Sequence, residues 1–331
     1  MRYYYMKFSI IVPFYGSKVQ GFLRSSRCSG AERSKGSRAQ ELLDRCLDSI
    51  KAQTFADYEL IVSEEGWDLS SSRNAGIEKA KGDWLLFADA DDWVSSDLLT
   101  ELSNTIAAHP TADIVEFPMI VHEGGKDEHL LTFPSVSIDI RNPKPLWLQQ
   151  QEYTHTYACN KAYRREMFDD VRFIEGRKFE DVWTLPLILE KASEIVTMDR
   201  GLYHYMWNSQ GICAKADGQD LTDLLEAHLE VVNRWNLQQE DGYAEYFMHL
   251  LNIQIDVYKL TGKVLLDGSR SSKVQEFKGS RGSRAQAFKG SRSSRVQEFK
   301  GSRSKSRPKL KYLCYRLLGV EKMCKLWKSL S

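Results

Sequence analysis

Three carboxylates lie within four positions of one another, directly after an apolar run. The run is Trp-Leu-Leu-Phe-Ala at residues 84–88, and the acids are Asp89, Asp91 and Asp92. Five apolar residues in a row predict a buried strand, and aspartate is disfavoured inside strands, so we expect the acids on the loop that follows. Ligands of open α/β sheets bind outside the carboxyl ends of the strands, and carboxylate oxygens suit a hard divalent cation. The alternative is a polar turn in which Asp92 or Ser96 caps the next helix.

The residues around these acids predict alternating strands and helices. We expect strands at 7–12, 58–62 and 84–88, and helices at 41–53 and 73–79, the second capped by a serine among residues 70–72. This alternation over the first 95 residues predicts an α/β fold with a parallel, doubly wound, Rossmann-like sheet. Further on we expect a helix at 98–108, a strand at 113–117, a hairpin at 119–133 that turns at Gly124 and Gly125, a helix from Phe179 to 191, and helical structure over 220–262.

The formal net charge of +1 conceals three basic segments and an acidic remainder. Residues 17–40 carry six basic and one acidic residue, residues 269–307 carry twelve and two, and residues 309–331 carry six and one. The rest of the chain therefore carries about −19. An acidic core argues against nucleic acid as a partner.

Cysteine usage and hydropathy favour a cytoplasmic setting. The six cysteines form no Cys-x-x-Cys pair, as expected of free thiols in a reducing compartment. The apolar run near Met1 is too short for export or for membrane spanning.

Residues 267–307 contain an eleven-residue repeat. The phrase Val-Gln-Glu-Phe-Lys-Gly-Ser-Arg at 274–281 recurs with two changes at 285–292 and unchanged at 296–303, and fragments of it occur in residues 17–40. Such a basic, low-complexity composition predicts disorder. The 17–40 segment interrupts the loop after the first strand, where it is a harmless excursion, a lid or an obstruction.

Residues 308–331 predict a basic amphipathic helix. Leucines, Met323 and Trp327 alternate there with lysines and Arg316. Such a helix can lie peripherally on an anionic membrane surface, here on the inner face of the cell membrane. The alternative is a terminal helix that packs on the domain.

Four segments resemble the family 2 glycosyltransferases. They are Ile-Ile-Val-Pro-Phe-Tyr at 10–15, residues 47–55, Ser-Arg-Asn-Ala-Gly-Ile at 72–77, and residues 82–92. The resemblance covers roughly residues 7–210, including 159–165 and 179–183, and implies the GT-A fold. Together with composition and periodicity, it suggests the following division: a GT-A domain at 1–215 with the 17–40 insert, a helical extension at 216–266, disordered repeats at 267–307 and a C-terminal helix at 308–331.

The resemblance also implies the site residues. Pro13 and Tyr15 would line the nucleotide pocket, and Arg73 would lie against the nucleotide end of the donor. Asp89 would face the ribose or phosphates, and Asp91, with Asp89, would hold Mg²⁺ or Mn²⁺. Glu64 and Glu65 stand where the family usually has Asp-Asp-Gly-Ser, and they would accept hydrogen bonds from the base or ribose.

Asp181 would be the catalytic base that takes the proton of the acceptor hydroxyl, with Glu180 as the second candidate. Inversion requires a carboxylate on the side of the anomeric carbon opposite to the leaving group, and Asp181 lies on a different element from Asp91. The alternative is an acid at a helix N-terminus, which the helix dipole stabilises.

The implied function is inverting transfer of a hexosyl or N-acetylhexosaminyl group from a UDP-sugar. The acceptor would be a saccharide or a lipid-linked glycan, in cell-surface polysaccharide synthesis. One alternative is a sugar-phosphate nucleotidyltransferase, although Pro13 to Gly16 lacks the glycine-rich phosphate loop typical of that class. The other is a catalytically degenerate protein that binds nucleotide sugars or acts as a scaffold.

Overall fold

The structure, a computed structural model, describes residues 7–14, 30–122, 129–207, 213–266, 319–325 and 327–328. The chain forms two compact units, and each is described by itself. The first comprises Met1–Arg141, Tyr157–Gly176 and Thr184–Asn208, and the second Asn142–Thr156, Arg177–Trp183 and Ser209–Ser331. Three pieces of the predicted 1–215 domain, residues 142–156, 177–183 and 209–215, thus belong to the second unit. Tyr15, most of the 17–40 insert and the repeats at 267–307 lie outside the described residues.

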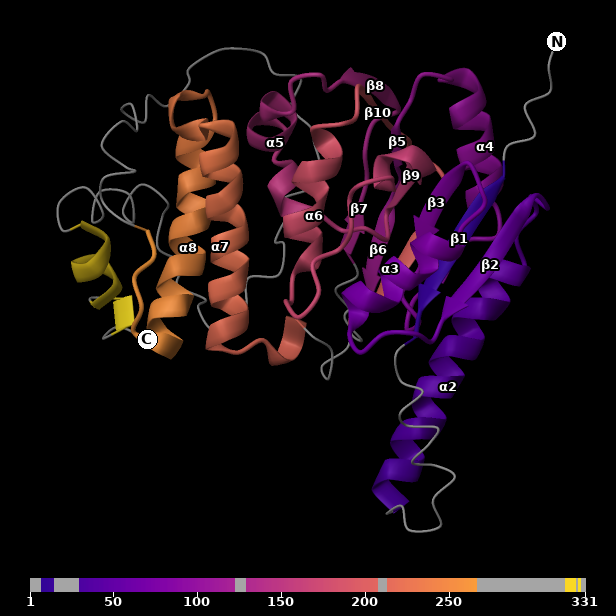
Figure 1. The fold of residues 1–331 in the computed structure, drawn as a ribbon, viewed down its shortest axis with the longest axis horizontal. Coiled ribbons are helices and arrows are strands. Elements are labelled where there is room, and N and C mark those ends of the chain that lie inside the picture. The colour runs from indigo at the N-terminus through magenta and orange to yellow at the C-terminus, as the bar shows by residue number, and fades with distance from the viewer. Residues whose placement is uncertain are drawn as a thin grey trace. The chain divides into compact units, whose positions relative to one another are not determined.

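A seven-stranded sheet with the order β2-β1-β3-β9-β5-β10-β8 forms the centre of the first unit (Figure 1). Its strands are β1 (Phe8–Pro13), β2 (Tyr58–Ser63), β3 (Trp84–Phe87), β5 (Ile114–Glu116), β8 (Val136–Asp139), β9 (Lys161–Arg164) and β10 (Glu194–Thr197). Five strands run in one direction, and β8 and β9 run the opposite way. The prediction of a doubly wound, mostly parallel sheet is therefore confirmed.

The alternation of side chains along β1 places helices on both faces of the sheet. Phe8, Ile10 and Val12 pack in one core with α2 (Gly30–Lys51) and α4 (Leu98–Ala108). Successive strand residues point to opposite faces, so Ile11 faces the other way, toward α3 (Leu69–Lys79). There a Cβ atom built on Gly76 would lie 2.3 Å from Cγ2 of Ile11. Glycine therefore lets α3 approach β1 closely.

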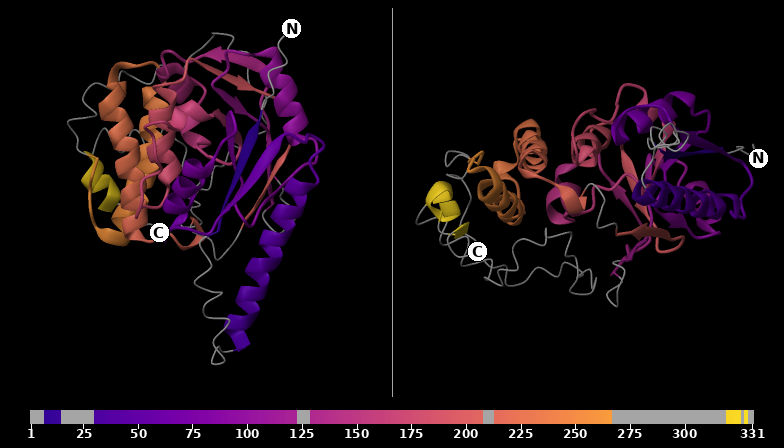
Figure 2. Two further views of the ribbon diagram at one scale, coloured as in Figure 1. Left: turned by 45° about the vertical axis from the view of Figure 1, so that its right-hand side comes forward. Right: turned by 90° about the horizontal axis from the view of Figure 1, so that it is seen from below.

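Two helices begin at other residues than predicted. Helix α2 starts at Gly30, so the last part of the predicted 17–40 insert is helical, and its first turns extend away from the sheet (Figures 1 and 2). Helix α3 is capped by Asp68 and not by a serine at 70–72: the Asp68 carboxylate accepts the N–H of Ser71 at 2.8 Å. The Ser71 side chain binds back to the Asp68 main chain, which completes a capping box.

A smaller sheet, β4-β11-β6-β7, belongs to the same unit. Its strands are β4 (Trp93–Val94), β6 (Met119–His122), β7 (His129–Leu131) and β11 (Tyr203–Met206). Strands β6 and β7 pair antiparallel, as the predicted hairpin requires, and the turn at Gly124 and Gly125 lies outside the described residues. Strand β11 pairs with β4, so it comes to lie beside the residues that follow the acids.

The second unit is helical in its described part. It contains α5 (Lys144–Gln149), the start of α6 (Glu180–Leu189), α7 (Gly218–Trp235) and α8 (Tyr243–Thr261). The predicted helical structure over 220–262 is present as two helices. Asn236 (φ 49°) and Gly242 (φ 91°) take left-handed conformations, and the chain turns between α7 and α8. Aromatic packing holds the unit together, for example Trp147 edge-to-face on Trp235 with ring centres 5.6 Å apart.

The described part of the C-terminal segment, residues 319–325 and 327–328, is helical. Its apolar side chains Val320, Met323, Cys324 and Trp327 are buried. The ammonium group of Lys328 lies 5.7 Å from the ring centre of Tyr258 in α8. These contacts match the alternative of a terminal helix packed on the protein. Among the described helices, none combines the length and the apolar character needed to cross a membrane.

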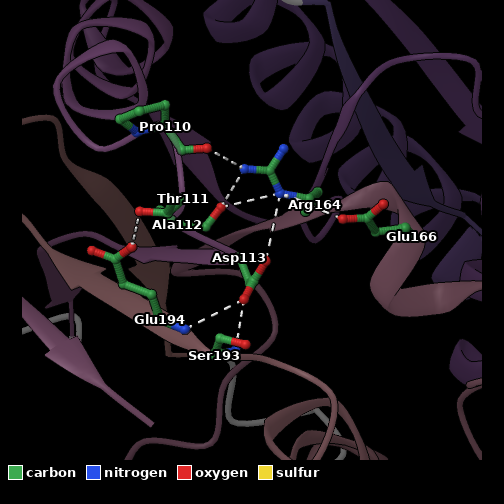
Figure 3. Close-up of polar contacts among 8 residues, drawn as sticks. All are labelled: Pro110, Thr111, Ala112, Asp113, Arg164, Glu166, Ser193 and Glu194. Atoms are coloured by element: carbon green, nitrogen blue, oxygen red, sulfur yellow. Dashed lines mark hydrogen bonds and ion pairs between the residues drawn. The ribbon is translucent and has the colours of Figure 1, made fainter. Parts of the chain in front are cut away.

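A polar network stabilises the edge of the large sheet at which β3 begins (Figure 3). Arg164 donates to the carbonyl oxygens of Pro110 and Ala112 at 2.9 and 2.6 Å, and its Nε lies 3.6 Å from the carboxylate of Asp113. The Asp113 carboxylate also accepts the N–H of Ser193 at 2.6 Å. This network joins the turn before β5 to the last residue of β9 and to the start of β10.

Glu194, the first residue of β10, predicts a pH-dependent contribution to stability. Hydrogen bonds from the hydroxyls of Ser137 and Thr111 lower the pKa of its carboxyl below the usual 4.5. A group with a lowered folded pKa stabilises the fold above its unfolded pKa and loses that contribution as the pH falls through the folded value. We expect the difference in free energy of unfolding between wild type and Glu194→Gln to shrink below pH 4.5, as measured by urea titration. The exposed Glu175→Gln is the control, and a difference that does not change with pH would contradict the prediction.

Gly76→Ala tests the close approach of α3 to β1. The new methyl group would overlap Ile11, and overpacking a core typically costs about 1–3 kcal/mol. This outweighs the roughly 1 kcal/mol that alanine gains over glycine in a helix. We expect Gly76→Ala to lower the urea midpoint of the wild-type protein. In a protein that already carries Ile11→Ala, which removes the overlapped side chain, the same glycine substitution should lower the midpoint less. Unchanged stability of the single variant would show that α3 and β1 are further apart.

Candidate functional site

Strands β1, β2 and β3 end side by side. Pro13, the last residue of β1, pairs with Ser63, the last residue of β2. Ala88, which follows β3, donates its N–H to the carbonyl oxygen of Ile11 at 3.0 Å. The loop that begins at Asp89 therefore leaves the sheet at the edge where α/β sheets bind ligands.

Arg73, near the start of α3, contacts Asp89. Its Nη2 lies 3.0 Å from Oδ1 of Asp89. The guanidinium group lies 5.1 and 5.9 Å from the ring centres of Phe173 and Phe87, a separation at which aromatic faces attract a cation. Only 2% of the Arg73 side chain is exposed, against 23% for Asp89. The structure thus brings these two predicted site residues together and holds a positive charge beside Asp89.

Asp92 is fully buried and serves the structure of the loop. Its Oδ2 accepts the hydroxyl of Tyr203 and its Oδ1 the N–H of Met206, both at 2.7 Å. Burial, and then the charges of Asp89 and Asp91, raise the pKa of the Asp92 carboxyl well above its usual range, although the two hydrogen bonds oppose this. The interpretation of Asp92 as a helix cap is wrong, because the residue that precedes α4 is Asp97, which makes no side-chain cap.

Asp91 is half-buried, and its main chain is held from helix α2. Arg45 donates to the Asp91 carbonyl oxygen at 2.5 Å and lies 4.2 Å above the ring of Trp93. Trp93 stacks on His204 with ring centres 4.8 Å apart, and Nδ1 of His204 lies 3.0 Å from Nε2 of His122. A column of planar groups from α2 and the smaller sheet thus lies beside the acid loop.

The composition of this loop fits a divalent cation. Asp89, Asp92 and Cys159 each offer a ligand atom within 4.8 Å of the others. Asp92 is buried and already accepts two hydrogen bonds, so the carboxylates best able to reach an ion are the half-buried Asp89 and Asp91. Oxygen ligands suit Mg²⁺ or Mn²⁺, and the charge of a bound ion would offset the repulsion among the carboxylates.

Glu64 and Glu65 are exposed and follow β2 at the same edge. The Glu65 carboxylate pairs with the ammonium group of Lys79 at 2.8 Å, and its carbonyl oxygen accepts the Ser72 hydroxyl at 2.6 Å. Pro13 is buried at the end of β1. Accordingly, all of the first unit's predicted site residues except Tyr15, which is outside the described residues, lie at this edge or on the loops that leave it.

Asp181 lies in the second unit, in the first turn of α6, and is half-buried. The chain enters that turn through Phe179, whose φ is 60°. A left-handed conformation is uncommon for a bulky residue, and strain of this kind clusters at functional sites. The left-handed conformation of Phe179 could not be predicted from the sequence, since backbone strain has no compositional signature.

A buried ion pair at the same edge was also not predicted. Lys161, at the start of β9, is fully buried with its Nζ 2.9 Å from Glu116, at the end of β5, and 3.2 Å from Asn160. Asn160 also donates to Glu116 at 3.2 Å. Because a buried charge is costly unless it is paired and hydrogen-bonded, these three residues must stay together. Only the unusual Asn-Lys pair within an apolar stretch hinted at them.

Part of the chain matches a known protein family. Residues 60–172 match the family described as glycosyl transferase family 2. The chain is 26% identical over 212 residues to EpsJ of Bacillus subtilis, an uncharacterized glycosyltransferase, covering 52% of this chain and 59% of EpsJ. It is 26% identical over 165 residues to GgaB of Bacillus subtilis, a minor teichoic acid biosynthesis protein, covering 49% of this chain and 18% of GgaB.

Among solved structures, the fold is similar to that of S. aureus TarS (residues 1–349) in complex with UDP-GlcNAc. The TM-score is 0.53 at 16% sequence identity, over 77% of this chain and 81% of TarS. Residues 60–172 therefore match the family 2 glycosyltransferases, and the fold of the chain is of the GT-A type. It spans less than two thirds of the length of either of the two Bacillus relatives.

Proposed function

We propose that this protein is an inverting glycosyltransferase that moves a sugar from a nucleotide sugar to an acceptor hydroxyl. The observation that carries the proposal is the pair of half-buried carboxylates, Asp89 and Asp91, on the loop after β3 of a GT-A sheet, with Arg73 held against Asp89. The UDP-GlcNAc complex of TarS supports a UDP-sugar as donor. The role of GgaB in teichoic acid biosynthesis supports a cell-surface polymer as product.

On the donor side, the residues of the first unit bind and orient the nucleotide diphosphate. Asp91, with Asp89, would hold Mg²⁺ or Mn²⁺, which would supply positive charge for the departing diphosphate. Arg73 holds the Asp89 carboxylate in place, because its guanidinium group is buried and lies near two aromatic rings. Pro13, Glu64 and Glu65 lie at the strand ends where the nucleoside would bind, and Tyr15, which is outside the described residues, is proposed as a further residue of the nucleotide pocket.

On the acceptor side, Asp181 acts as general base. Its carboxylate takes the proton of the acceptor hydroxyl while the hydroxyl oxygen bonds to the anomeric carbon. The bond from that carbon to the diphosphate oxygen breaks on the opposite side, so the configuration inverts. Asp181 is favoured over Glu180 because Glu180 is only 5% exposed, whereas Asp181 is half-buried.

We further propose a saccharide or lipid-linked acceptor and a cytoplasmic site of action. Cys46 and Cys324 are free thiols, which suits a reducing compartment. The six basic residues of 309–331 against one acidic residue would attract an anionic membrane surface. Because Val320 and Met323 are buried, the attraction would depend on charge.

The experiment compares Asp91→Ala and Asp181→Asn with wild type in Mn²⁺-dependent release of UDP from UDP-sugars. We expect Asp181→Asn to bind UDP normally but to lose about 10²–10⁴-fold in rate, the usual share of a general base. We expect Asp91→Ala to weaken Mn²⁺-dependent UDP binding as well as the rate. Asp97→Asn, which removes an exposed carboxylate near the same loop, is the control.

Two outcomes would contradict the proposal. Wild-type protein that binds UDP and Mn²⁺ but turns over none of the common UDP-sugars, with or without an added acceptor, would indicate a nucleotide-sugar-binding scaffold. Full activity of Asp181→Asn would remove Asp181 from the mechanism.

A further inference from the structure

We propose that Tyr203 is a positioning residue for the cation-binding carboxylates, because its hydroxyl ties together the two ends of the acid loop. This inference rests on the proposed function. Tyr203 itself is 1% exposed, so it does not meet the substrate and acts through Asp89 and Asp92.

The tie consists of two hydrogen bonds at one oxygen. The Tyr203 hydroxyl accepts the N–H of Asp89 at 3.0 Å and donates to Oδ2 of Asp92 at 2.7 Å. The other oxygen of Asp92 accepts the N–H of Met206 at 2.7 Å. Both ends of the loop are thereby attached to β11, a strand more than a hundred residues further along the chain.

Asp91 lies between the two attached residues. The N–H of Asp92 donates to the carbonyl oxygen of Asp89 at 3.0 Å, which closes a turn around it. The carbonyl oxygen of Asp91 is held by Arg45 at 2.5 Å. With its main chain fixed on both sides, the Asp91 carboxylate can bind a cation with little loss of conformational entropy.

Loss of the Tyr203 hydroxyl would release the loop. A buried N–H of Asp89 and a buried oxygen of Asp92 would each lose a partner, and unsatisfied buried groups drive local rearrangement. Groups that orient metal-binding carboxylates in this way typically change metal affinity by about 10–100-fold when they are removed.

The experiment is a titration of Tyr203→Phe with Mn²⁺ in the presence of UDP, followed by the electron paramagnetic resonance of free Mn²⁺. We expect the dissociation constant for Mn²⁺ to rise about 10–100-fold, while UDP binding without metal stays at its wild-type value. Tyr58→Phe is the matched control. It removes a tyrosine hydroxyl that likewise forms a hydrogen bond with the main chain, here by donating to the carbonyl oxygen of Ile50 at 3.0 Å, but at the start of β2.

Wild-type Mn²⁺ affinity in Tyr203→Phe would overturn the inference. So would an equal loss in Tyr58→Phe, which would indicate a general effect of reduced stability. If Tyr203→Phe does not fold, Asp92→Asn replaces it: its amide group cannot accept from both Tyr203 and Met206, and the same rise is expected, with wild-type affinity again overturning the inference. Wild-type protein that binds neither Mn²⁺ nor UDP would overturn the proposed function, and the role of Tyr203 with it.

Discussion

The crowding of Asp89, Asp91 and Asp92 in one turn is the constraint on which the first unit depends. Like charges this close oppose one another's ionisation, and together with burial, which is the larger cause, they raise the pKa of the Asp92 carboxyl. Each acid is therefore held by a group from another element. Arg73 of α3 pairs with Asp89, Arg45 of α2 binds the main chain of Asp91, and β11 supplies both donors to Asp92. Two helices and a strand thus converge on one turn.

This arrangement explains why the chain forms a second, smaller sheet. Strand β4 follows the acids directly, and its pairing with β11 brings Tyr203 beside the loop. Nearby, the buried pair of Lys161 and Glu116 adds further charge to the same edge of the large sheet. Buried ion pairs are weak evidence for stability. Charged side chains gathered where the strands end, such as the pairs Lys161–Glu116 and Arg73–Asp89, are instead what a binding site for charged ligands requires.

Much of the fold follows from short-range pattern. The apolar runs of β1, β2 and β3 and the periodic helix α4 were predicted to within one or two residues, since burial of one face leaves a regular spacing. The extent of α2 was missed because a Ser-, Arg- and Gly-rich composition resembles that of a disordered segment. The break between α7 and α8 was missed because apolar periodicity continues past Asn236, whose left-handed conformation depends on how the helices turn back.

That the acids follow a buried strand and that the strands form an α/β sheet could be predicted from the sequence, because both properties depend on residues that are close together in the chain. Which side chains contact the acids is a property of the tertiary structure. Arg73 is 16 residues from Asp89, Arg45 is 46 from Asp91, and Tyr203 is 111 from Asp92. Only Arg73 was expected near the site, and that through family resemblance. Hydrogen bonds over such separations depend on which strands pair and how closely helices pack, and no local pattern of residue types encodes them.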